Sequence, residues 1–137
     1  MIQRKAQTLK YIDIFILGSY LYYLVELCFN LCFSFSNFVI IFSPIKQLTA
    51  LLLGGISFII IYSIHREKFF DIISKGIVCG FLICLLEFIV GGIYLQFDIR
   101  VWKYAFLDYK GLISFSWTML WSLLSTIVLY ICKRFKL

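Results

Sequence analysis

One long apolar stretch, residues 76–97, reads GIVCGFLICLLEFIVGGIYLQF and carries a single charged residue, Glu87, near its middle. A helix needs about 20 apolar residues to cross the hydrocarbon core of a bilayer. The stretch is long enough for that, so the sequence predicts a membrane-spanning helix here.

The composition of the whole chain indicates the same class of protein. The 137 residues are 63% hydrophobic and 15% charged, and the mean hydropathy is +0.99. An average soluble domain is about half apolar and about a quarter charged. A soluble fold of this size has too much surface to hide so many apolar side chains, and the same numbers exclude disorder and coiled coil.

Three further apolar runs, at residues 11–33, 48–64 and 111–132, complete the pattern. We expect an all-α, polytopic membrane protein: a four-transmembrane-helix bundle forming a single transmembrane domain over residues 1–137. The first run is too long for a signal peptide and has no small-residue cleavage pattern after it.

The loop at residues 34–47 has a short apolar centre that ends at Pro44. Because so few apolar residues cannot span a bilayer, we expect them to lie at the interface or against other helices.

The basic residues predict the orientation. The net charge is +6, and nine of the 13 Lys and Arg fall at the two ends of the chain or within residues 65–75. Positive residues favour the cytoplasmic side, so both termini are expected there. The charge is thus explained by the lipid bilayer as partner, and no nucleic acid is implied.

Glu26 and Glu87 occupy similar contexts, Leu-Val-Glu-Leu and Leu-Leu-Glu-Phe, each in the first helix of a helical pair. Two tandem helical hairpins related by duplication are one interpretation. The other is that apolar helices resemble one another by composition.

A carboxylate within a bilayer costs about 3 kcal/mol and usually faces the protein interior. Glu26 and Glu87 are therefore candidates for a proton-, cation- or amine-binding site, or for hydrogen bonds that only join helices. Polar stripes on the first and fourth helices add the substrate or ion-binding candidates Tyr22, Tyr23, Asn30 and Trp121. We expect these stripes to point inward and the two glutamates to lie close together.

Small residues predict where helices approach closely. Gly76, Gly80 and Gly91 share a face with Glu87, and the first two form a Gly-x-x-x-Gly pattern. Gly54 and Gly55 lie near the middle of the second span.

In the outer loop, Trp102 and Tyr104 are the remaining binding candidates. They fit either an interfacial aromatic belt or a lid over the outer mouth.

The residue patterns of metal, redox and nucleotide-binding sites are absent from the sequence. His65 is the only histidine, the five cysteines form no Cys-x-x-Cys pair, and no phosphate-binding Gly-x-x-x-x-Gly-Lys loop is present. No nucleophile–base pair is visible either. We predict no enzyme, no catalytic residue, no metal and no cofactor, so any ATPase would be a separate chain.

Several segments resemble the CmpB-like family of small bacterial membrane proteins, the type IV permeases of ABC transporters. They include Tyr23-Leu24-Val25-Glu26, Leu52-Leu53-Gly54-Gly55, Glu87-Phe88-Ile89-Val90-Gly91 and Val101-Trp102-Lys103-Tyr104. Lys103 and Ala105 depart from the Asp and Ser of the family's Val-Trp-Asp-Tyr-Ser loop. The resemblance implies a permease or transporter of the bacterial cytoplasmic membrane, with a homo-oligomer, a partner membrane subunit or a separate ATPase. The alternative is a non-transport scaffold or accessory subunit whose glutamates only pack helices.

Overall fold

Four helices dominate the computed structural model: α1 (Ile2–Phe33), α2 (Pro44–His65), α3 (Ile72–Gln96) and α4 (Phe115–Phe135). Two short antiparallel strands, β1 (Asp108–Tyr109) and β2 (Ile113–Ser114), lie between α3 and α4 in the chain. Each helix contains a segment long and apolar enough to cross a membrane, which confirms the predicted all-α class with four such helices. The structure describes the backbone of residues 2–33, 44–68, 70–100, 102–103 and 108–135, and the side chains of 10–28, 44–68, 70–100, 102–103 and 109–134.

The chain forms two compact units, Met1–Ile59 and Ile60–Leu137. The boundary falls inside α2, before the end of the first predicted hairpin. The single transmembrane domain of four spans stays a prediction, and so does the duplication of a helical hairpin.

In the first unit, α1 and α2 meet at glycines. A Cβ atom added to Gly18 would lie 2.8 Å from the carbonyl oxygen of Gly54, and one added to Gly54 would lie 2.7 Å from that of Gly18. Only glycine permits so close an approach of two helix backbones. Gly55 faces the ring of Phe15 in the same interface.

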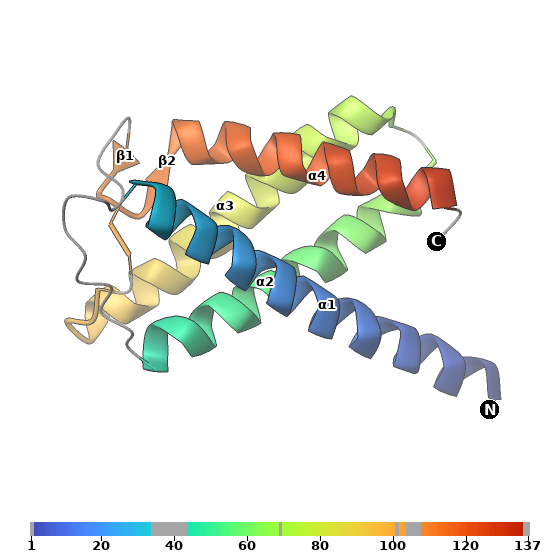
Figure 1. Ribbon diagram of the computed structural model, residues 1–137, viewed down its shortest axis with the longest axis horizontal. Helices are drawn as coiled ribbons and strands as arrows, with labels where there is room; N and C mark the ends of the chain where they lie inside the picture. Colours follow the sequence, from blue (N-terminus) through green and yellow to red (C-terminus); the bar gives the residue numbers. More distant parts are fainter. Residues whose placement is uncertain (1, 34–43, 69, 101, 104–107, 136–137) are drawn as a thin grey trace. The chain divides into compact units, whose positions relative to one another are not determined.

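In the second unit, α3 and α4 pack against each other and run in opposite directions (Figure 1). Asp71 caps the N-terminus of α3, its carboxylate accepting hydrogen bonds from the backbone N–H groups of Ile73 and Ser74 at 3.1 and 3.3 Å. These bonds satisfy two of the N–H groups that a helix start leaves without partners.

All four helices start at other residues than the predicted spans: α1 and α3 begin at Ile2 and Ile72 rather than at residues 11 and 76, and the other two starts have a clear local cause. The second helix begins at Pro44 rather than Leu48, because proline fits the first helical position, where its missing N–H is not needed. The fourth begins at Phe115 rather than Gly111. Lys110 and Gly111 have φ of 55° and 70°, and Leu112 N–H bonds to the Tyr109 carbonyl at 3.1 Å, so a hairpin turn precedes that helix.

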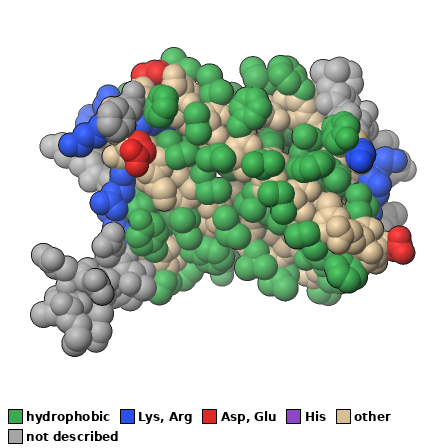
Figure 2. All heavy atoms as spheres, turned by 180° about the vertical axis from the view of Figure 1, so that it is seen from behind, with side chains coloured by type: hydrophobic (Ala, Val, Ile, Leu, Met, Phe, Trp, Pro, Cys, Tyr) green, Lys and Arg blue, Asp and Glu red, His purple; other side chains and the backbone are tan. Residues whose placement is uncertain are grey.

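Each helix exposes several large apolar side chains, and apolar side chains make up most of the face drawn in Figure 2, with Lys and Arg gathered toward its left and right margins. On α3, Phe81, Leu85 and Ile89 are at least half exposed, whereas Cys79, Ile83 and Glu87 are buried on the opposite face. This division is typical of a helix with one face toward lipid and the other toward a neighbouring helix.

Candidate functional site between α3 and α4

The buried face of α3 contains the predicted glycines. A Cβ atom on Gly80 would lie 2.7 Å from the backbone nitrogen and 2.8 Å from the Cα atom of Ser122. A Cβ atom on Gly76 would meet the side chain of Thr126. The two helices are therefore in backbone contact along this part of the interface.

Glu87 lies in the same interface and is only 2% exposed. The indole N–H of Trp121 on α4 donates a hydrogen bond to its Oε1 atom at 3.0 Å, in buried surroundings. Trp121 was predicted as a candidate from its stripe on the fourth helix, and the structure brings it to Glu87. An indole carries no charge and can donate to a carboxyl oxygen in either protonation state.

The hydroxyl groups of α4 line the interface at four-residue steps. Thr118, Ser122 and Thr126 each donate to the carbonyl oxygen four residues earlier, at 3.0, 2.8 and 2.8 Å. Because these donors are satisfied within α4, they place small side chains against α3 without unmet hydrogen bonds. Ser125 is 1% exposed, and its hydroxyl has no partner among the described residues.

Beyond Glu87, the loop and hairpin pack onto the last turns of α3. The Trp102 indole donates to the Leu112 carbonyl at 3.0 Å. A Cβ atom on Gly91 would lie 2.8 Å from the Leu112 side chain and 3.0 Å from the Trp102 ring. The centre of the Tyr109 ring lies 6.1 Å from that of the Phe88 ring, and the two rings are tilted by 44°. Trp102 thus contacts both α3 and the hairpin formed by β1 and β2, and it holds the loop before that hairpin against them.

Four other predicted binding residues, Tyr22, Tyr23, Glu26 and Asn30, belong to α1. Tyr22 is buried against Gly54, while Tyr23 and Glu26 are half-buried. The side chain of Asn30 lies outside the described residues, and so does Tyr104, in the loop between α3 and β1. Glu26 and Glu87 belong to different units, so their proximity stays a prediction.

Two structural residues were not predicted from the sequence. Lys75 was counted only as a cytoplasmic charge, yet it is 9% exposed and its ammonium donates to the carbonyls of His65, at 3.1 Å, and Glu67. Gly18 lies where the backbones of α1 and α2 approach closely. Its spacing of four residues from Tyr22, on the predicted polar stripe, could have indicated it.

Among the described residues, no three His, Cys, Asp or Glu side chains come together in a way that could hold a metal ion. No protein-family model, curated protein or solved structure matches the chain. The resemblance to the type IV permease family therefore stays a prediction.

Proposed function

We propose that the protein is a permease-type subunit of the bacterial cytoplasmic membrane and that Glu87 is its proton- or cation-handling group. Both termini lie in the cytoplasm in this proposal, and a second copy, a partner membrane subunit or a separate ATPase completes the transport path. The four apolar helices support the membrane placement. The carboxyl group of Glu87 can bind a proton or a cation. The proposed substrate is therefore a proton, a cation, or a solute whose transport is coupled to a proton or a cation.

The buried Glu87–Trp121 pair is the observation that carries this proposal. Ionisable residues within membrane helices are rare and commonly mark ion pathways and proton relays. A glutamine in the same place would accept the same hydrogen bond and would avoid the cost of an ionisable group. The presence of a glutamate therefore favours a role for its proton over a role in packing alone.

The test uses the protein, purified together with any subunit that accompanies it, in lipid vesicles that contain a pH-sensitive dye, with a potassium diffusion potential as the driving force. We expect proton uptake above that of empty vesicles for the wild type, and the empty-vesicle rate for Glu87→Gln at equal thermal stability. Glu87→Gln vesicles that take up protons as the wild type does would refute the role of Glu87.

A scaffold or accessory function is the second candidate, and the backbone contact at Gly80 favours it. An interface this close cannot open without losing its packing, as suits a rigid support. In that case Glu87→Gln leaves both stability and cellular activity unchanged, because the amide oxygen still accepts from Trp121. The same variant thus separates the two functions, with Trp121→Phe as the control that removes the bond itself.

A further inference from the structure

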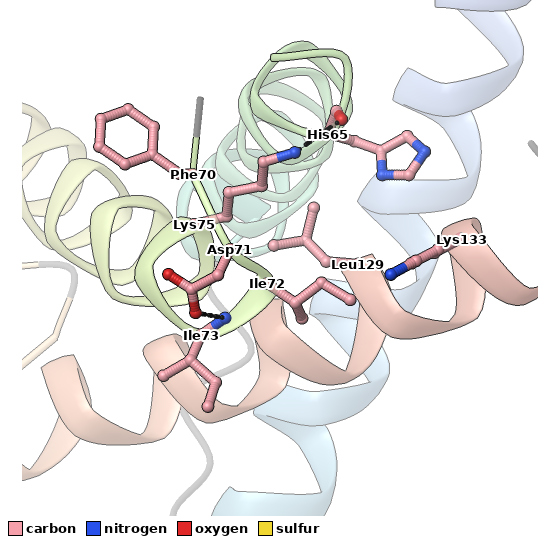
Figure 3. A pocket seen from close by; sticks show the side chains of 8 residues that line it. All are labelled: His65, Phe70, Asp71, Ile72, Ile73, Lys75, Leu129 and Lys133. Carbon is pink, nitrogen blue, oxygen red and sulfur yellow. Dashed lines mark hydrogen bonds between the residues drawn. The ribbon is translucent and has the colours of Figure 1, made fainter. Parts of the chain in front are cut away.

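A cavity of about 380 Å³ lies in the second unit where α2 ends, α3 begins and α4 ends (Figure 3). Its size falls in the range of small-molecule sites, which begins at about 300 Å³. Three basic side chains from three helices line it, His65, Lys75 and Lys133. It is separate from the Glu87 site and plays no part in the function proposed above.

Lys75 supplies a fixed positive charge to this cavity. The two carbonyls of His65 and Glu67 hold its ammonium in place, and Figure 3 shows the side chain extended toward the end of α2. Carbonyl oxygens orient an ammonium but do not neutralise it. An ammonium has three N–H donors, and the two carbonyls use two of them.

Asp71 also lines the cavity, but its carboxylate is engaged by its own helix. Figure 3 shows it turned to the backbone N–H of Ile73, and the hydroxyl of Ser74 donates to it as well. These hydrogen bonds, that of Ser74 foremost, hold the pKa of Asp71 below its ordinary value. The lining therefore holds two lysine side chains and one carboxylate, with the imidazole of His65 beside them.

The rest of the lining is apolar, from Phe70, Ile72, Ile73 and Leu129. Phe70 is 56% exposed and Ile73 65% exposed, so apolar surface continues outward from the basic groups. A small hydrophilic anion would use the ammonium groups and leave these side chains in contact with water. A molecule with a phosphate next to hydrocarbon would use both parts.

We infer that this cavity binds the phosphate headgroup of an anionic phospholipid, with Lys75 and Lys133 contacting the phosphate and Phe70 and Ile73 contacting the glycerol and upper acyl chains. Basic pockets between membrane helices on the cytoplasmic side commonly hold such headgroups. In the proposed topology this end of the chain lies at the cytoplasmic leaflet, but the binding test does not depend on that placement.

The test measures lipid binding to the full chain in an uncharged detergent by the shift in thermal unfolding temperature. Phosphatidylglycerol, phosphatidylcholine and inorganic phosphate are titrated separately. Lys133→Glu is the variant, because Lys133 is exposed at the end of α4 and lines the cavity. Arg134→Glu is the matched control: the next residue, equally exposed, and outside the cavity lining.

We expect phosphatidylglycerol to raise the unfolding temperature, and Lys133→Glu to weaken that binding about ten-fold or more, since each nearby charge contributes several-fold to the binding of anionic lipid. Arg134→Glu should weaken it much less, because Arg134 does not line the cavity and its charge acts on the phosphate only from a distance, where about 0.1 M salt partly screens it. Equal losses in both variants, or equal stabilisation by phosphatidylcholine, would overturn the site. Stabilisation by inorganic phosphate at the same concentrations as the lipid would overturn the lipid as ligand and leave a soluble phosphate in its place. If Lys133→Glu fails to fold, Lys133→Gln gives the same comparison with Arg134→Gln.

Discussion

Replacing Gly80 with alanine tests the backbone contact between α3 and α4. The added Cβ atom would lie 2.7 Å from the nitrogen and 2.8 Å from the Cα atom of Ser122, whereas ordinary contact between such atoms begins near 3.4 Å. Both opposing atoms are backbone, so no rotamer change relieves the clash and the helices must move apart by about 0.7 Å. Overpacking of this kind costs about 1–3 kcal/mol.

Alanine also favours a helix over glycine by about 1 kcal/mol, which offsets part of that loss. Gly92→Ala separates the two effects, because a Cβ atom on Gly92 meets nothing within 4 Å. Both variants carry the same change of helix propensity in the same helix. The difference in their stabilities therefore measures the steric cost of about 1–3 kcal/mol at Gly80 alone.

The assay is unfolding of the purified protein in detergent, followed by circular dichroism. We expect Gly80→Ala to be less stable than the wild type and Gly92→Ala to be equal or more stable. The reasoning is refuted if Gly80→Ala unfolds at the same denaturant concentration as Gly92→Ala, because the backbone contact would then be absent in solution.

Three other predictions concern the ends and turns of the helices. Lys110→Gly should stabilise the protein by about 0.5–1 kcal/mol in chemical unfolding, because Lys110 has a φ of 55° that glycine adopts with less strain than lysine; a loss would show that the turn is formed differently. Asp71→Asn should reduce stability at neutral pH but not in strong acid. Because the pKa of Asp71 is lower in the folded protein than in the unfolded chain, its carboxylate stabilises the fold above the ordinary carboxyl pKa. This stabilisation disappears as the pH falls through the pKa of the folded state. A difference in stability between the wild type and Asp71→Asn that stays constant across pH would contradict the cap. Reporter fusions at Leu137 and at Lys103 should report the inside and the outside of the membrane, and an outside signal at Leu137 would refute the topology.

The presence of four helices could be predicted because each needs only an apolar run of sufficient length. The boundaries were harder, since they depend on local chemistry: Pro44 starts a helix that was predicted four residues later, and the turn at Lys110 and Gly111 delays the last one. Turn residues next to an apolar run do not interrupt its hydropathy, so hydropathy alone extends the helix through them.

The buried face of α3 could be predicted from its glycines and Glu87, because small and polar residues are what distinguishes one face of this apolar helix from the other. The partner of Glu87 was harder to identify. The bond to Trp121 depends on the rotation of two helices about their axes, and the sequence of one helix says nothing about the rotation of the other. Lys75 escaped prediction for a similar reason, since its partners are backbone carbonyls that any residue at those positions would offer.

The protonation of Glu87 itself is the most direct test of the proposed function. Infrared difference spectra of the protein in lipid vesicles, recorded between acid and alkaline pH, detect the carbonyl band of a protonated carboxyl. We predict a band in the wild type that changes with pH, is absent from Glu87→Gln, and moves in Trp121→Phe, because the indole N–H at 3.0 Å no longer polarises the carboxyl oxygen. Identical difference spectra for the wild type and Glu87→Gln would show that this carboxyl exchanges no proton, and would contradict the account.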